Sequence, residues 1–210
     1  MRPSQVKDFA QLYSQNCSGC HGADGKFGPA LPLDNPVYLA LVDDAALRRV
    51  IAQGVPGTAA PPLARSAGGV LTDEQIDLLI SGIRQRWARP DLFAAVALPP
   101  YAGDGTGDAT RGRDVYATSC AACHGADGTG TAKVGSIVDP SYLALVSDQA
   151  LRTLVIAGRP DLGHPDWRGY PPGPPLTAQQ VSDVVAWLAA QRTRFPGQPY
   201  SQEARGETQQ

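Results

Sequence analysis

Two short stretches of this 210-residue chain place a pair of cysteines and a histidine at fixed spacing. They are CSGCH and CAACH, with Cys17, Cys20 and His21 in the first and Cys120, Cys123 and His124 in the second. Two thiols three positions apart on one helical turn can reach the two vinyl groups of one porphyrin, and the next residue places an imidazole under the iron. The pattern C-x-x-C-H is typical of covalent haem attachment. The two motifs predict two haem c groups, with His21 and His124 as proximal iron ligands.

Other uses of a cysteine pair fit the chain less well. A zinc site needs two such pairs within about 15–20 residues, whereas Cys17 and Cys120 are 103 positions apart. A thioredoxin-like redox motif would need alternating strand and helix patterns around it, which the sequence lacks. Disulfide pairing would not require a histidine behind each pair. Covalent haem therefore remains the favoured prediction.

The chain repeats one unit, and this repeat sets the domain organisation. Four segments recur at offsets of 103 to 105: CHGADG at 20–25 and 123–128, YLALV at 38–42 and 142–146, ALRRVIAQG at 46–54 with ALRTLVIAG at 150–158, and LTDEQIDLLI at 71–80 with LTAQQVSDVV at 176–185. The expected parts are a first domain at 1–88, a Pro/Gly-rich linker at 89–107, a second domain at 108–195 and a polar tail at 196–210.

Each unit is expected to be helical. Apolar residues at helical spacing precede the first haem motif, and a short helix is expected around DAALRRVIAQ. A last helix is predicted to begin after Thr72 or Thr177, each an N-cap with a glutamine three residues later, at the capping-box position. No segment shows sustained two-residue alternation, so the predicted fold class is all-α.

Both units resemble class I cytochrome c domains, in which C-x-x-C-H follows the first helix and a terminal helix packs across it. The resemblance covers residues from about 5 to 88 and from 108 to 194. It implies two tandem cytochrome c domains, each folded around one haem. It also implies that the carbonyl of Pro29, in the KFGPAL segment, accepts a hydrogen bond from the proximal imidazole; the second unit has no such proline.

The sixth ligand is where the chain departs from the family. The family's second loop usually carries Met-Pro, with the sulfur on the iron, but Met1 is the single methionine here. The repeat places Ala60 and His164 at that position, each followed by proline. His164 is predicted to be the second haem's distal ligand, which makes that haem bis-histidine. Ala60 has no donor atom, so the first haem is expected to be open or water-bound; a ligand from a partner and a misregister are the alternatives.

The resemblance also predicts how the first and last helices of each unit cross, with a small residue against an aromatic one. The offsets pair Phe9 with Gly82 in the first unit, and Gly112 with Trp187 in the second. Glycine inside a helix costs about 1 kcal/mol relative to alanine, so a packing reason is expected for both.

Two arginines, Arg48 and Arg152, occupy matching positions of the two units. They are candidates to pair with haem propionates. A solvated helix face is the simpler explanation for both.

The favoured function is electron transfer between redox protein partners by a dihaem cytochrome that is not an enzyme. A net charge of −2 argues against nucleic acid as a partner. The sequence has no apolar run of about 18 residues, so no membrane span is predicted. Haem is attached outside the cytoplasm in the systems that these motifs resemble, so a periplasmic location is expected, with the signal or anchor outside this chain.

Two alternatives remain. One is gas binding or peroxide reduction at an open first haem, although the loop around Ala60 offers only Arg65 and Ser66 for acid–base chemistry. The other is a haem subunit of a larger respiratory or photosynthetic complex.

Overall fold

The computed structural model describes residues 3–93, 95, 97–169 and 174–193. The predicted polar tail lies outside these residues. Within them the chain forms helices and no named strand, with two isolated bridges between Ala64 and Leu71 and between Arg159 and His164. The all-α prediction is confirmed. The α-helices are α1 (Phe9–Asn16), α2 (Ser18–His21), α3 (Pro36–Leu41), α4 (Asp44–Gln53), α5 (Asp73–Trp87), α6 (Ala109–Ser119), α7 (Ala121–His124), α8 (Pro140–Leu145), α9 (Asp148–Ala157) and α10 (Ala178–Ala190), and the short 3-10 turns are η1 (Pro3–Gln5), η2 (Arg65–Ala67), η3 (Pro90–Phe93) and η4 (Pro160–Leu162).

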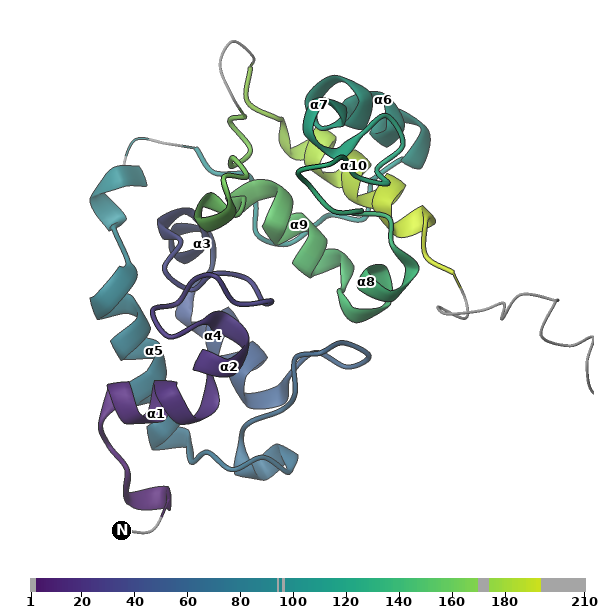
Figure 1. Cartoon of the computed structure of the whole chain (residues 1–210). Coiled ribbons are helices and arrows are strands. Elements are labelled where there is room, and N and C mark those ends of the chain that lie inside the picture. The colour runs from purple at the N-terminus through teal and green to yellow at the C-terminus, as the bar shows by residue number, and fades with distance from the viewer. Residues whose placement is uncertain (1–2, 94, 96, 170–173, 194–210) are drawn as a thin grey trace, which may run out of the picture.

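The helices fall into two halves with the same order, α1 to α5 and α6 to α10 (Figure 1). In each half the first helix contacts the last, α1 with α5 and α6 with α10. Across the boundary, α9 contacts α3, and the apolar core of the first half continues into Ile156, Ala157, Trp167 and Val181 of the second. The two halves therefore share buried apolar surface.

The last helix of each half begins as predicted. The hydroxyls of Thr72 and Thr177 accept the N–H of the glutamine three residues on, both at 3.2 Å. The side-chain oxygens of Gln75 and Gln180 accept the threonine N–H at 3.1 and 2.9 Å. Two complete capping boxes satisfy backbone groups that a helix terminus would otherwise leave unpaired.

Two short helices, α3 and α8, were not predicted. Each begins with a side-chain cap and a proline, Asn35-Pro36 and Asp139-Pro140. Proline at the first helical position, directly after an Asn or Asp cap, is a known helix-start signal. That signal was present in the sequence and marks both helices.

The predicted crossing of the first half is confirmed. A Cβ added to Gly82 would overlap the ring of Phe9, so the ring occupies the space that a side chain at 82 would need. Phe9 also lies edge-on to Trp87, with ring centroids 6.1 Å apart. The glycine thus lets α1 and α5 approach with an aromatic ring between them.

In the second half the crossing is tighter than predicted. A Cβ on Gly112 would lie 2.9 Å from the Cβ of Trp187, so these two residues are in contact as expected. The closest neighbour, however, is the backbone carbonyl of Asp183, which that Cβ would overlap. At this point α6 meets the main chain of α10, while the Trp187 ring stacks on Tyr116 with centroids 4.2 Å apart.

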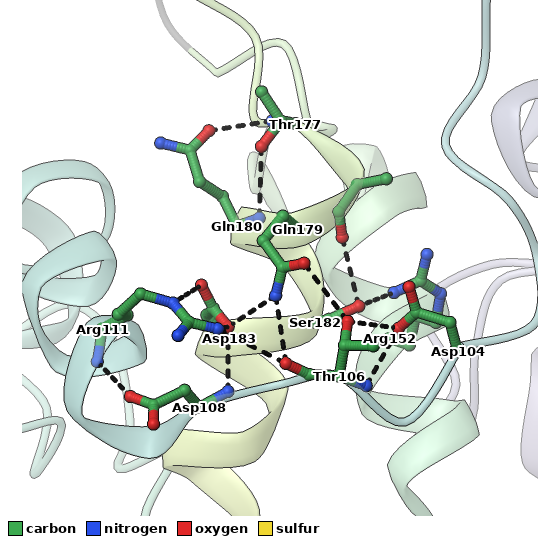
Figure 2. Close-up of polar contacts among 11 residues, drawn as sticks. Asp104, Thr106, Asp108, Arg111, Arg152, Thr177, Gln179, Gln180, Ser182 and Asp183 are labelled. Carbon is green, nitrogen blue, oxygen red and sulfur yellow. Dashed lines mark hydrogen bonds and ion pairs between the residues drawn. The ribbon is translucent and has the colours of Figure 1, made fainter.

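The side chain of Asp183 joins α6 and α10 beside this crossing (Figure 2). It is 4% exposed, and its carboxylate accepts two bonds from Arg111 at 2.8 and 2.9 Å. The backbone N–H of Asp108 and the side-chain amide of Gln179 donate to it at 2.8 and 2.9 Å. These donors, the Arg111 side chain first, lower the pKa of Asp183 to about 2.

Removing this carboxylate should destabilise the second domain. We expect Asp183→Ala to lower the free energy of unfolding of this domain by about 2–3 kcal/mol, because the partly buried N–H of Asp108 loses its acceptor and the charged hydrogen bonds from Arg111 are lost with it. The folded-state pKa lies below the ordinary 3.8, so the stabilisation is complete above about pH 4 and is lost as the pH falls towards 2.

Urea unfolding at pH 7 and at pH 3 measures this effect. The difference between wild type and variant should shrink at pH 3. Asp114→Ala, which changes an exposed carboxylate on α6, the helix that Asp183 contacts, is the matched control and should cost little. A difference that is the same at both pH values would contradict the role given to the charge of Asp183.

Arg48 and Arg152 have different surroundings. Arg48 is half-exposed and pairs with Asp77 on α5. Arg152 is 4% exposed and donates to the carbonyl of Pro100, at 3.0 and 2.9 Å, and to the hydroxyl of Ser182. The solvated face predicted for Arg152 is wrong, because the chain that joins the two halves folds over it.

Candidate haem sites

The first haem motif follows directly on α1. Cys17 ends α1 and also begins α2, which carries Cys20 and His21. The hydroxyl of Tyr13 donates to the carbonyl of Gly22 at 2.8 Å and ties the end of α2 to α1. In the second half Tyr116 makes the same bond to Gly125. The two motifs are therefore presented by the same local fold.

The four cysteines are suited to thioether links. All are free of disulfides; Cys20 and Cys123 are exposed, and Cys17 and Cys120 are partly buried. Burial, with a smaller effect of the neighbouring thiol, raises the pKa of Cys17 and of Cys120 to about 11. These two sulfurs are neutral at pH 7, and a thioether, which carries no charge, can occupy the same place without the cost of burying a thiolate.

His21 is oriented by the loop that follows its motif. Its Nδ1 lies 2.7 Å from the carbonyl of Leu31. This acceptor differs from the Pro29 carbonyl that the family resemblance implied. The N–H of Ala30 donates to the carbonyl of Cys20 at 2.9 Å. This bond holds residue 30 against the motif, and the next carbonyl, that of Leu31, lies within hydrogen-bonding distance of Nδ1. With Nδ1 engaged, Nε2 is the nitrogen left for a metal.

His124 lacks this partner. The ring is 9% exposed, and its Nδ1 is buried without a hydrogen bond in the structure. The second unit has no proline in the corresponding loop, and the equivalent of the Leu31 bond is not formed by the described residues. The Nδ1 of His164 is the other buried side-chain atom without a partner among the residues described.

The structure resolves the register of the distal loops. The N–H of Val55 donates to the carbonyl of Ala60 at 2.9 Å, and that of Arg159 donates to the carbonyl of His164 at 3.1 Å. The glycine before each donor, Gly54 or Gly158, has positive φ and lies too close to this loop for a side chain. Ala60 and His164 therefore occupy equivalent backbone positions in the two halves, as the repeat predicts.

His164 is brought to the proximal histidine of its own half. The ring centroids of His124 and His164 are 5.6 Å apart, with the planes at 55°. Because an imidazole nitrogen lies about 2 Å from a metal that it binds, two rings on opposite sides of one iron have centres about 6 Å apart. The observed 5.6 Å is close to this value, so the spacing of the two rings is compatible with one shared iron.

All three histidines are held in the form that binds metals. Burial is the main cause that lowers the pKa of His21, His124 and His164. Nearby charge adds to this at His164, from His124 and from Arg159. A lowered pKa keeps an imidazole neutral at pH 7, with a lone pair free for iron.

The loop around Ala60 offers no comparable donor. The hydroxyl of Thr58 is already used, since it donates to the carbonyl of Val55 at 2.8 Å and accepts the N–H of Ala60. The N–H of Ala59 donates to the carbonyl of Leu145 in the second half. The hydrogen bonds of residues 58–60 thus involve backbone groups and the Thr58 hydroxyl, which already has two partners.

Comparisons with known proteins agree with both halves. The family model described as cytochrome c matches residues 109–191, and the model described as cytochrome c oxidase, cbb3-type, subunit III matches residues 4–81. The chain is a dihaem cytochrome c. It consists of two class I cytochrome c domains, and it carries two covalently bound haem c groups.

Curated relatives of this cytochrome include two subunits named as cbb3-type cytochrome c oxidase components. FixPc of Rhizobium leguminosarum bv. viciae is 26% identical over 80% of this chain and 56% of its own length. CcoP of Azospirillum sp. (strain B510) is 28% identical over 59% of this chain and 40% of its own. The chain thus spans about half the length of these relatives.

Among solved structures, the Kuenenia stuttgartiensis reducing HAO-like protein complex is 16% identical over 92% of this chain and 99% of that chain, with a TM-score of 0.48. At these values the likeness adds nothing to the assignment. Within the described part of this cytochrome, no helix combines the length and apolar character needed to cross a bilayer.

Proposed function

We propose that this cytochrome is an extracytoplasmic electron carrier that passes electrons between redox partners as a subunit of a larger complex. Its relatives FixPc and CcoP are named as subunits of cbb3-type oxidases, which supports an oxidase as that complex. Electron transfer by a cytochrome c needs two things of the protein: ligands that set the iron potential, and a shell that positions the haem.

The observation that carries the proposal is the pair of rings of His124 and His164, 5.6 Å apart. We assign them as the two axial ligands of the second haem. Cys120 and Cys123 carry this haem, and Cys17, Cys20 and His21 hold the first. A histidine in place of methionine lowers the reduction potential, since axial methionine raises it.

At the first haem, Ala60 leaves the position opposite His21 without a side-chain donor. Binding of a small ligand there is the second candidate function, favoured by the engaged state of the Thr58 hydroxyl. Such a site would bind a neutral diatomic gas. It would not need to interrupt electron transfer through the second haem.

Added carbon monoxide tests whether the first haem is open and the second haem has both axial positions filled. We expect the reduced wild-type holoprotein to bind it at the first haem, because Ala60 offers no competing ligand. Ala60→Met should abolish this binding and raise the potential of the first haem, since the thioether sulfur occupies the sixth position. Absorbance spectra during titration with the gas, together with a redox titration, measure both effects.

Ala59→Met is the matched control, since residue 59 is the exposed neighbour in the same loop. It should leave gas binding unchanged. A wild-type protein in which both haems are low-spin and ignore carbon monoxide would contradict the open first site.

A further inference from the structure

The two halves meet through the loops that belong to their haem sites. On the first domain this is the segment 26–31, which follows the haem motif and supplies the Leu31 carbonyl to His21. On the second it is the segment 159–164, which ends at His164. The N–H of Phe27 donates to the carboxylate of Asp161 at 2.9 Å, and the guanidinium of Arg159 donates to the carbonyl of Gly28 at 3.0 Å.

Arg159 and Asp161 form one buried unit at this junction. Their side chains are 15% and 2% exposed, and two N–O contacts of 2.9 and 2.8 Å join them. A buried ion pair contributes little net stability, because desolvation offsets the attraction. Each member, however, makes an additional bond to the first domain, so the pair links the 159–164 loop to the 26–31 loop.

The main chain of Arg159 is bonded to His164 in both directions. The N–H of Arg159 donates to the carbonyl of His164 at 3.1 Å, and the N–H of His164 donates to the carbonyl of Arg159 at 2.9 Å. One residue therefore holds His164 through its backbone and, through its side chain, holds the loop that orients His21.

A second bond pins the segment just before Arg159. Asn35, 1% exposed, donates its side-chain amide to the carbonyls of Ala157 at 2.8 Å and Gly158 at 3.4 Å. The equivalent cap in the second domain is Asp139, whose carboxylate has no hydrogen to donate. The end of α9 is thus attached to the first domain immediately before the junction.

The first domain shows that the fold does not need this arginine. Its equivalent loop is VPGTAA, at 55–60, against RPDLGH at 159–164. Val55 makes the same backbone bond to Ala60 that Arg159 makes to His164. The charged side chains of Arg159 and Asp161 are therefore not needed for the backbone bond that closes this loop.

We propose that Arg159, paired with Asp161, is a positioning residue that fixes the His164 loop of the second haem site against the His21 loop of the first and so controls electron exchange between the two haems. This inference rests on the proposed electron-transfer function. In the exchange one electron passes: one iron is oxidised from Fe(II) to Fe(III), the other is reduced from Fe(III) to Fe(II), and no bond or proton changes. The rate of such a step falls steeply with distance.

The test uses the full-length holoprotein and the double variant Arg159→Val/Asp161→Gly. This variant gives the second loop the residues of the first domain at the two positions, so the loop can still close, and no unpaired charge is left buried. The control is Asp166→Asn/Arg168→Gln, which removes another Arg–Asp pair with two-residue spacing, bonded to each other at 2.6 Å. Both changes leave the net charge as it is.

Laser-triggered reduction of the oxidised protein, followed at the absorbance of each haem, gives the exchange rate. We expect the double variant to slow exchange by about tenfold or more, since misplacement by about 1 Å is enough for large losses in steps that depend on position. Arg159→Lys, which keeps a donor for the Gly28 carbonyl, should recover part of the rate. The control should match wild type. An unchanged rate in the double variant overturns the proposal.

Pulsed electron paramagnetic resonance between the two ferric haems supplies a readout that does not depend on electron exchange. We expect a longer or broader distance distribution in the double variant and no change in the control. If the wild type shows no exchange at all, the proposed electron-transfer route through both haems fails. The distance measurement still tests Arg159 in that case, and an unaltered distribution overturns its positioning role.

Discussion

His164→Ala is expected to convert the second haem from low-spin to high-spin while the first haem keeps its spectrum. The ring of His164 lies 5.6 Å from that of His124, and without it the iron has an imidazole on one side only. About half of the total haem absorbance should change, since the two domains carry one haem each. The uptake of carbon monoxide should rise from one per chain to two.

Absorbance and electron paramagnetic resonance spectra measure this change, and added imidazole provides a rescue. Free imidazole should enter the space left by the side chain and restore a low-spin second haem. Leu162→Ala is the matched control, because Leu162 is 65% exposed in the same loop and cannot ligate iron. Spectra of His164→Ala that are identical to those of wild type would show that another group binds the iron.

Local signals in the sequence were enough to predict the parts of the site that depend on near neighbours. The haem motifs occupy single turns, and each capping box spans four residues, so their geometry follows from spacing alone. The equivalence of Ala60 and His164 also came from the sequence, because the repeat keeps its register across short loops. The backbone bonds from Val55 and Arg159 confirm that register.

Long side chains explain part of what could not be predicted. Arg84 donates to the carbonyls of Leu39 and Val42 and pairs with Asp44, and in the second domain Arg192 does the same with Leu143, Val146 and Asp148. The partners are offset by 104, but the two arginines are offset by 108. An arginine can reach the same carbonyls from one helical turn further along, so an alignment by position does not pair them.

Loop paths and contacts between domains explain the rest. The carbonyl of Leu31, and not that of Pro29, accepts the hydrogen bond from His21. Which of these neighbouring carbonyls faces the imidazole depends on the path of the turn, and that path depends on contacts with distant residues. Phe27 has φ of 62° in that turn, an unfavourable value for a non-glycine residue, and Asp161 of the other domain holds its N–H. The sequence of residues 26–31 alone therefore could not predict this contact, because Asp161 is 134 positions away from Phe27.

Gly112→Ala is expected to lower the free energy of unfolding of the second domain by about 2–3 kcal/mol, although alanine favours a helix over glycine by about 1 kcal/mol. The added Cβ would overlap the carbonyl oxygen of Asp183 and would lie 2.9 Å from the Cβ of Trp187. Neither neighbour can rotate away, since both belong to the rigid part of α10. The two helices would have to separate, and the stacking of Trp187 on Tyr116 would be disturbed with them.

Gly82→Ala in the first domain is the matched comparison, because the neighbour there is the ring of Phe9 and not main chain. Phe9 is half-buried, so its ring can turn towards solvent at a cost below that of moving a helix, and the gain in helix propensity offsets part of it. Adding Phe9→Ala to Gly82→Ala should remove the overlap altogether. No side-chain truncation can do this for Gly112→Ala, since the obstacle is a backbone carbonyl.

Urea unfolding, followed at the absorbance of each haem, compares the two domains within one molecule. If Gly112→Ala lowers the free energy of unfolding no more than Gly82→Ala does, α10 can shift away from α6 at little cost. The contact with the Asp183 carbonyl would then not set the distance between these two helices.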